Sequence, residues 1–128
     1  MAYIVWKDSF DIGVPEMDYQ HKLFVSYINE LHKSIQFGYS KLNVVITLKK
    51  LADYIEVHFV EEEKLLISIN YPMLEVQIKQ HAYFISELAS MKNTYMSKTQ
   101  TANNMLIFMK DWFLHHITTE DIKYAEFI

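Results

Sequence analysis

Apolar residues recur along most of the chain with the three- and four-residue spacing of an amphipathic helix. The first stripe consists of His21, Phe24, Val25, Ile28, Leu31, His32 and Ile35. This spacing places the side chains on one face of a helix. Asp18 is a candidate N-cap for this helix, and Gly38 is a candidate C-terminal stop. The pattern therefore predicts a first helix over residues 18–37.

Three further helical stripes follow the first. We expect residues 40–70 to form the second helix, with Ser40 as its cap, and residues 72–95 to form the third, with Pro72 in its first turn. The polar run Ser97–Asn104 is the expected connection to a fourth helix, which starts at Met105 and includes His116. Four helices with short links are typical of an antiparallel, up-down-up-down four-helix bundle.

The N-terminal segment differs from the rest because residues 1–17 show no sustained helical period. We interpret this segment as an extended arm that lies on the bundle, with Trp6, Phe10 and Ile12 as its anchors. The predicted fold class is therefore all-α, a four-helix bundle with an extended N-terminal arm. Residues 1–128 are expected to form a single domain.

Composition narrows the possible partners. The chain has a formal net charge of −4 with acids and bases interspersed, so it has no basic stripe for nucleic acid. No apolar run approaches the length of a membrane span, and the N-terminus lacks the pattern of a signal peptide. Cysteine is absent, which excludes disulfides, thiolate ligands and iron–sulfur clusters. These features predict a cytoplasmic protein without a nucleic-acid or membrane partner.

Each of the four stripes carries a histidine that could take part in one shared site, and the second stripe also carries a carboxylate. The histidines are His21, His58, His81 and His116, and Glu62 lies four residues after His58, on the same helix face. A single histidine on such a face is usually a hydrogen-bonded core residue. Burying this whole set would be costly unless its members share a partner. Imidazole and carboxylate ligands suit iron, copper or zinc, so the pattern predicts a metal site.

Asp121 is a separate case, because it follows His116 by five residues. On a regular helix this spacing is a rotation of about 140°, which would point the carboxylate away from the site. Asp121 can join the site only if the helix ends or distorts near Thr118 and Thr119. The Glu-x-x-His pair of ferritin-like di-iron proteins and the His-Glu-x-x-His of zinc hydrolases are both absent.

The order of motifs is more specific than any one of them. The chain carries in turn Trp6, MDYQHKL at 17–23, HFVEE at 58–62, Tyr71–Pro72, HAYF at 81–84, WFLHHI at 112–117 and Asp121. This order resembles the bacterial branch of the hemerythrin family, and the resemblance covers nearly the whole chain. It implies that residues 1–128 form one hemerythrin-like domain that holds two iron ions inside the bundle and binds dioxygen.

The resemblance also implies roles for the site residues. His21 and His58 would hold the iron that keeps an open position for dioxygen, and His81 and His116 would hold the other. Glu62, Asp121 and a solvent oxygen would bridge the two irons. An apolar pocket would keep water from the bound gas, and the same side chains would also serve as ordinary core packing. Its candidate residues are Phe24, Phe59, Trp112, Phe113 and Ile117.

Gln77 is a departure from the family pattern on the third helix, where His-x-x-x-His becomes Gln77-x-x-x-His81. Its amide oxygen could be a weak metal ligand, or Gln77 could hold a water in that coordination position. Alternatively, it could satisfy neighbouring polar groups in a site that has lost one metal. His115 is a further candidate to replace the missing imidazole, although it lies about 100° from His116 around the helix.

The leading functional hypothesis is reversible dioxygen binding, for carriage, storage or sensing. A binding protein is favoured over an enzyme because the chain shows no phosphate loop, nucleophile or substrate-binding motif. The alternative is a di-iron redox enzyme acting on peroxide, nitric oxide or oxygen, which an additional open position at Gln77 would favour. A third hypothesis is a bundle that serves protein–protein contacts and keeps a degenerate metal site.

Overall fold

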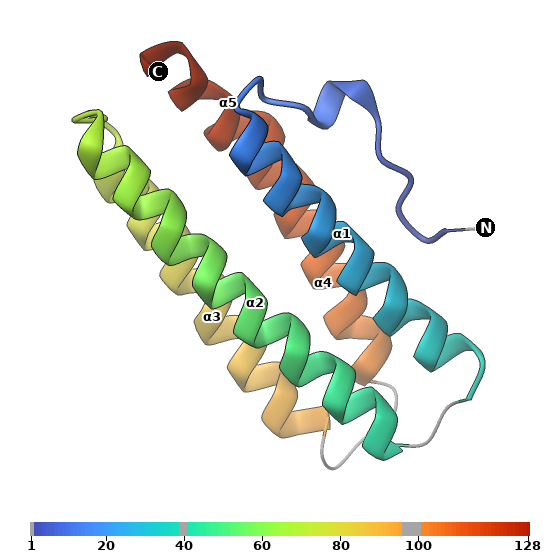
Figure 1. Ribbon diagram of the computed structural model, residues 1–128. Helices are drawn as coiled ribbons and strands as arrows, with labels where there is room; N and C mark the ends of the chain where they lie inside the picture. The colour runs from blue at the N-terminus through green and yellow to red at the C-terminus, as the bar shows by residue number, and fades with distance from the viewer. Residues whose placement is uncertain (1, 39–40, 96–100) are drawn as a thin grey trace.

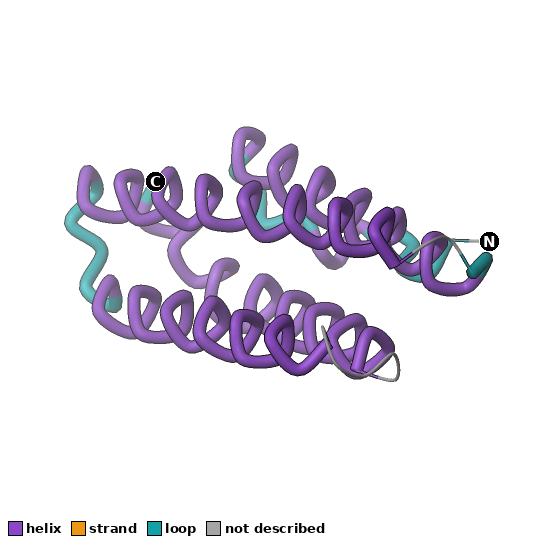
Figure 2. Tube along the Cα trace, turned by 90° about the horizontal axis from the view of Figure 1, so that it is seen from below, coloured by secondary structure: helices purple, strands orange, loops and turns teal. Residues whose placement is uncertain are grey.

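The computed structural model describes residues 2–38, 41–95 and 101–128, and these form four long antiparallel helices (Figures 1 and 2). Their bounds are α1 (Pro15–Gln36), α2 (Lys41–Ser68), α3 (Leu74–Tyr95) and α4 (Thr101–His116). Each helix packs against the next, and α1 packs against α4, which closes the bundle. The described residues contain no strand. The prediction of an all-α, up-down-up-down bundle is confirmed.

The start of α1 differs from the prediction. The helix begins at Pro15, three residues before Asp18, because proline has no N–H to leave unsatisfied and its φ suits the first helical position. Asp18 is not the N-cap. Its carboxylate instead accepts hydrogen bonds from the backbone N–H groups of Ile12 (2.8 Å) and Gly13 (3.2 Å), which fixes the entry of the arm. Gly38 lies after the helix with φ +66°, as a C-terminal stop requires.

The end of α2 is closed by a Schellman motif. Asn70 adopts a left-handed conformation with φ 53° and donates its backbone N–H to the carbonyl of Ile67 at 3.1 Å. The N–H of Tyr71 reaches the carbonyl of Leu66 at 3.0 Å. These two bonds satisfy carbonyls that the end of a helix leaves unpaired. The predicted stop near Asn70 is therefore correct.

Two other predicted boundaries are wrong. Pro72 lies in the turn before α3, which begins at Leu74. Residues 101–104 were expected to belong to a loop, but they form the first turn of α4. The polar composition of residues 101–104 favoured a loop, but such a local preference is weak and tertiary context overrides it. The expected cap Ser40 and the remaining residues of that connection, 97–100, lie outside the described residues.

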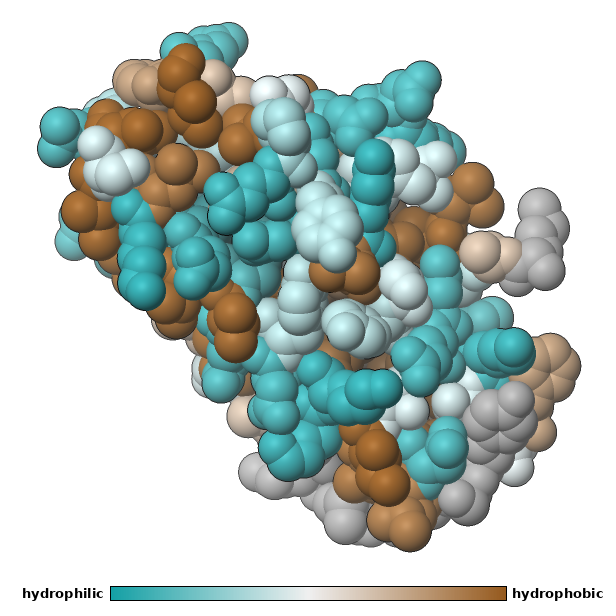
Figure 3. Space-filling view, viewed as in Figure 1, coloured by the Kyte–Doolittle hydropathy of each residue, from teal (hydrophilic) through white to brown (hydrophobic). Residues whose placement is uncertain are grey.

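The interior consists of two apolar clusters with a polar layer between them. On α1, Met17 belongs to the smaller cluster and Phe24 to the larger one, and His21 lies between them. On α2, Phe59 belongs to the larger cluster and Leu66 to the smaller one. On the face shown in Figure 3, hydrophilic and hydrophobic side chains are mixed over this interior. No helix in the described part of the chain is long and apolar enough to cross a bilayer.

The N-terminal arm is held by backbone contacts as well as by its aromatic residues. The Asn29 side chain accepts the N–H of Ile4 at 2.7 Å and donates to the Ile4 carbonyl at 2.9 Å. Trp6 and Phe10 pack partly buried against the larger cluster, and Ile12 is buried in the smaller one, as expected. Ile4, which is 4% exposed, is an anchor that the sequence pattern did not reveal.

We expect Asn29→Ala to release the arm, because it removes both hydrogen bonds to Ile4. The loss should destabilise the fold by about 1–2 kcal/mol, since each net hydrogen bond contributes about 0.5–1.5 kcal/mol. Hydrogen exchange at the Ile4 amide should accelerate. Glu30→Ala, at the neighbouring exposed position, is the matched control. Equal Ile4 exchange rates in the two variants would contradict this role for Asn29.

Candidate metal centre

The polar layer between the two apolar clusters contains all seven residues predicted for the metal site. Each helix contributes at least one of them, and every side chain in the set is buried. The set is His21 on α1, His58 and Glu62 on α2, Gln77 and His81 on α3, His116 on α4, and Asp121 just beyond it. None is more than 2% exposed. The structure therefore brings together residues that lie up to a hundred positions apart in the sequence.

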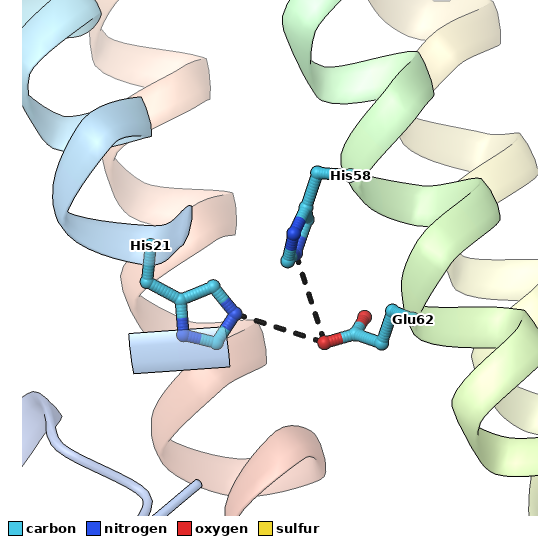
Figure 4. Close-up of side chains that lie close together, drawn as sticks. All are labelled: His21, His58 and Glu62. Carbon is cyan, nitrogen blue, oxygen red and sulfur yellow. Dashed lines mark ion pairs between the residues drawn. The ribbon is translucent and has the colours of Figure 1, made fainter. Parts of the chain in front are cut away.

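Glu62 lies at the centre of this layer. Its Oε2 is 3.7 Å from the Nε2 of His21 and 3.7 Å from the Nε2 of His58 (Figure 4). Its other oxygen, Oε1, is 3.0 Å from the Nε2 of His81. One carboxylate therefore faces histidines from three helices.

Asp121 enters the layer through a change in helix geometry. The segment η2 (Ile117–Asp121) is a π-helical turn, in which hydrogen bonds run from residue i to i+5. His116 and Asp121 are five residues apart, so the π turn brings them together where a regular helix would separate them. Asp121 Oδ1 lies 3.0 Å from His116 Nε2, and Oδ2 lies 3.3 Å from His21 Nε2.

Two threonines support this turn at the place where the sequence required a distortion. The hydroxyl of Thr118 donates to the carbonyl of Leu114 at 2.7 Å, and that of Thr119 donates to the carbonyl of His115 at 2.6 Å. Hydroxyl bonds of this kind to the carbonyl four residues earlier accompany bends in helices. The His115 side chain is exposed, so it does not replace a ligand in the layer.

The orientation of three histidines is fixed by acceptors outside the layer. The contacts to the ring nitrogen Nδ1 are His58 to Gln20 Oε1 (2.7 Å), His81 to Glu63 Oε2 (2.8 Å) and His116 to Gln80 Oε1 (2.7 Å). Each of these oxygens accepts the Nδ1 proton, which leaves a lone pair on Nε2 facing the interior. Metal-binding histidines commonly have this arrangement, because the acceptor sets both the tautomer and the ring orientation.

Sequence reasoning missed these three acceptors. Gln20 and Gln80 each precede a predicted histidine ligand, and Glu63 follows Glu62. Their position next to a predicted ligand was the available sequence signal for a role at the site. It does not identify the partner, because each acceptor bonds to a histidine on a neighbouring helix and not on its own.

The polar atoms of this layer do not all satisfy one another by hydrogen bonds, and their arrangement suits metal ions better. With Nε2 unprotonated, the 3.2 Å separation between His81 Nε2 and His116 Nε2 places one lone pair against another. Among the described residues, the buried side-chain atoms without a hydrogen-bond partner are His21 Nδ1 and Nε2, Glu62 Oε1, Gln77 Oε1 and Asp121 Oδ2. All belong to this layer. Two groups have ligand atoms within 4.8 Å of one another, His21–His58–Glu62 and Glu62–His81–His116, and they share Glu62.

The electrostatics of the layer also require positive charge. Burial lowers the pKa of His58 to about 4. Burial would lower the pKa of His21 too, but Asp121 and Glu62 outweigh it and raise this pKa to about 9. Burial opposes ionisation of Glu62, yet the surrounding histidines hold its pKa well below the usual value. Burial and the Glu62 charge oppose ionisation of Asp121 too, but His116 and His21 hold its pKa below the usual value. Both carboxylates therefore stay ionised and need protons or metal ions on the histidines around them.

Each carboxylate also receives one hydrogen bond from a neutral donor. The Tyr124 hydroxyl donates to Glu62 Oε2 at 2.8 Å, and the Gln77 amide nitrogen donates to Asp121 Oδ1 at 2.9 Å. Burial, followed by the Glu62 charge, raises the pKa of Tyr124 far above its usual range, which keeps the hydroxyl protonated. Sequence reasoning missed Tyr124. The available signal was its spacing of three residues from Asp121, which places both on one side of a helix.

Aromatic rings form walls on the histidines. Phe59 stacks on His81 with ring centroids 3.8 Å apart, and Trp112 stacks on His116 at 4.6 Å. Phe113 meets His21 edge-on at 5.5 Å. The other two predicted pocket residues also lie in the larger cluster: Phe24 stacks on Phe113, and Ile117 is fully buried. The five residues thus separate the polar layer from solvent on that side.

Comparisons with known proteins agree with this geometry. Residues 12–128 match the Hemerythrin HHE cation binding domain family. The chain is 27% identical over 126 residues to a bacteriohemerythrin of Stenotrophomonas maltophilia (strain R551-3), covering 98% of this chain and 82% of that relative. It is 29% identical over 127 residues to a bacteriohemerythrin of Clostridium acetobutylicum, covering 95% and 98%.

Solved structures give the same answer for the fold. The crystal structure of a leucine-to-alanine mutant of hemerythrin superposes with a TM-score of 0.89 at 24% identity, covering 99% of this chain and 98% of that one. A leucine-to-tyrosine mutant of hemerythrin gives a TM-score of 0.88 at 25% identity, covering 98% and 97%. With its fold, its histidine-rich layer and a family match over most of its length, the chain belongs to the hemerythrin family.

Proposed function

We propose that this chain is a non-haem di-iron protein that binds dioxygen reversibly within a single hemerythrin-like domain spanning residues 1–128. The observation that carries the proposal is the position of Glu62. Its two oxygens contact histidines of both candidate metal groups, as a ligand shared by two ions must. Hemerythrins bind dioxygen at such a centre, and family membership supports the same activity here.

In this proposal, His21 and His58 would hold one ion, and His81 and His116 would hold the other. Glu62 and Asp121 would be shared by both ions, a role supported for Asp121 by its contacts to His116 at 3.0 Å and to His21 at 3.3 Å. Two ferrous ions, when bound, would supply the electrons that reversible dioxygen binding requires.

The surrounding residues have three tasks in this function. Gln20, Glu63 and Gln80 orient the imidazoles through Nδ1, and Tyr124 holds Glu62. Phe113, stacked on Phe24 at 4.3 Å, covers the His21 side, where we place the gas. Because apolar walls exclude water, they suppress side reactions that would oxidise the centre irreversibly.

Catalytic turnover is the weaker alternative. Its support was the substitution at Gln77, which could open a second coordination position. The relatives carry the name bacteriohemerythrin, which favours ligand binding over an enzyme acting on peroxide or nitric oxide. The lack of cysteine suits a reducing compartment, so we place the protein in the cytoplasm.

Metal analysis together with optical spectra tests the function. We expect about two irons per chain, in keeping with two ligand groups that share a carboxylate. Azide should change the spectrum of the oxidised protein, and the reduced protein should form a stable oxygenated species on exposure to oxygen. Immediate conversion to the ferric form with peroxide turnover would support the enzyme instead. Iron well below one per chain, with helicity unchanged, would support a degenerate site.

We predict that His58→Ala removes about one iron per chain, because it deletes an imidazole and leaves only one on that ion. His32→Ala is the matched control, since His32 lies away from the layer and stacks on Tyr3 at 4.3 Å. Iron per chain can be measured by plasma emission against protein concentration. Full iron retention in His58→Ala would overturn the ligand assignment.

Tyr124→Phe should keep the ring and remove only the hydrogen bond to Glu62. Loss of such a partner typically weakens metal binding by about 10–100-fold. We therefore expect faster iron loss to a chelator, together with a lower reduction potential, because the carboxylate becomes a stronger donor. Tyr71→Phe, in the same apolar cluster, controls for packing. Identical potentials in the two variants would exclude a role for the Tyr124 hydroxyl.

Gln77→His tests whether the third-helix position limits the second ion. An added imidazole should raise iron content or slow spontaneous oxidation of the reduced protein, since imidazole is a stronger iron ligand than a neutral amide. Both are followed optically after anaerobic reduction. No change in either would count against any influence of residue 77 on the irons.

A further inference from the structure

Only one of the two polar groups of the Gln77 amide has a hydrogen-bond partner among the described residues. The side chain is 1% exposed, and its amide nitrogen donates to Asp121 Oδ1 at 2.9 Å. Its amide oxygen, Oε1, is buried and has no hydrogen-bond partner. A buried acceptor without a donor is unfavourable and therefore rare, which points to a missing partner.

The orientation of this amide is determined by Asp121. A carboxylate oxygen accepts hydrogen bonds, so the NH₂ group and not the carbonyl must face it. Rotating the amide by half a turn would place two acceptors together. Oε1 is therefore directed away from Asp121 Oδ1 but remains in the polar layer, because Gln77 precedes His81 by one helical turn on the same face.

An N–H or O–H donor suits Gln77 Oε1 better than an iron ion does. Carbonyl oxygens suit magnesium, calcium or manganese, whereas iron is favoured by imidazole. His81 lies one turn further along α3, and His116 contacts the same Asp121 oxygen as Gln77. Both histidines use Nδ1 for Glu63 and Gln80, and their Nε2 atoms carry lone pairs. No described side chain satisfies Oε1, so the donor must come from a molecule bound in the layer.

We propose that Gln77 Oε1 is the acceptor of a subsite for small protic ligands, which bind beside His81 and His116 and donate an N–H or O–H to it. This inference rests on the proposed di-iron function and identifies the class of exogenous ligand that the centre prefers. A protic ligand gains a hydrogen bond that a proton-free anion of the same size cannot form. Phe59, stacked on His81, and Trp112, stacked on His116, form apolar walls beside this position.

The experiment compares two linear triatomic probes, azide, which has no proton in its bound anionic form, and cyanamide, which carries N–H. Optical titration of the oxidised holoprotein gives both dissociation constants. Gln77→Met has similar length but lacks a strong acceptor, and it also loses the amide donor to Asp121, which affects both probes alike. Cyanamide affinity should therefore fall about tenfold more than azide affinity, as expected for one hydrogen bond to Oε1. Gln36→Met, at an exposed position of α1, should change neither.

An equal effect on both probes, or on azide alone, would overturn the proposal. A crystal structure of the unmodified holoprotein with cyanamide decides the matter even if Gln77→Met fails to load iron. A cyanamide nitrogen about 3 Å from Oε1 supports the subsite, whereas Oε1 bound to iron or out of contact overturns it. A holoprotein with two irons that fails this test loses only the subsite, while a chain without iron loses the proposed function as well.

Discussion

The whole structure depends on burying charge between two apolar clusters. Glu62 and Asp121 are ionised groups at 0% and 1% exposure, and neither has a lysine or arginine within ion-pair distance among the described contacts. Such groups are tolerated only where opposite charge and hydrogen bonds surround them. The four histidines, the π turn and the donors Tyr124 and Gln77 all meet that requirement. The bundle is therefore built around a polar layer whose two carboxylates need positive charge, from protons or metal ions, on the histidines around them.

The layer also fixes how the helices align. Gln20 on α1 bonds to His58 on α2, and Gln80 on α3 bonds to His116 on α4. Glu63 links α2 to α3 in the same way. A slide of one helix by a single turn, about 5.4 Å, would break these contacts while leaving apolar packing largely possible. The outer acceptors therefore specify the register that the apolar stripes leave open.

Helical periodicity was sufficient to predict the bundle, the four inward histidines and Glu62, because each lies on an unbroken stripe. It was insufficient for Asp121, since a π turn obeys a different spacing and only the resemblance to a family pointed there. Tyr124 and the Nδ1 acceptors escaped notice for another reason. Residues such as Gln20 and Glu63 are polar and only half-buried, so in a sequence they look like ordinary surface. Their role depends on a partner from another helix, which no local pattern contains.

The chain has two tryptophans, and the fold places them in different environments. Trp112 stacks on His116 with an interplanar angle of 11°, while Trp6 lies on the arm with Lys22 over its ring. Indole emission from Trp112 is thus exposed to quenching by whatever the neighbouring imidazole binds, and that from Trp6 reports on the arm. The protein consequently carries two intrinsic fluorophores that distinguish loading of its interior from detachment of its N-terminal segment.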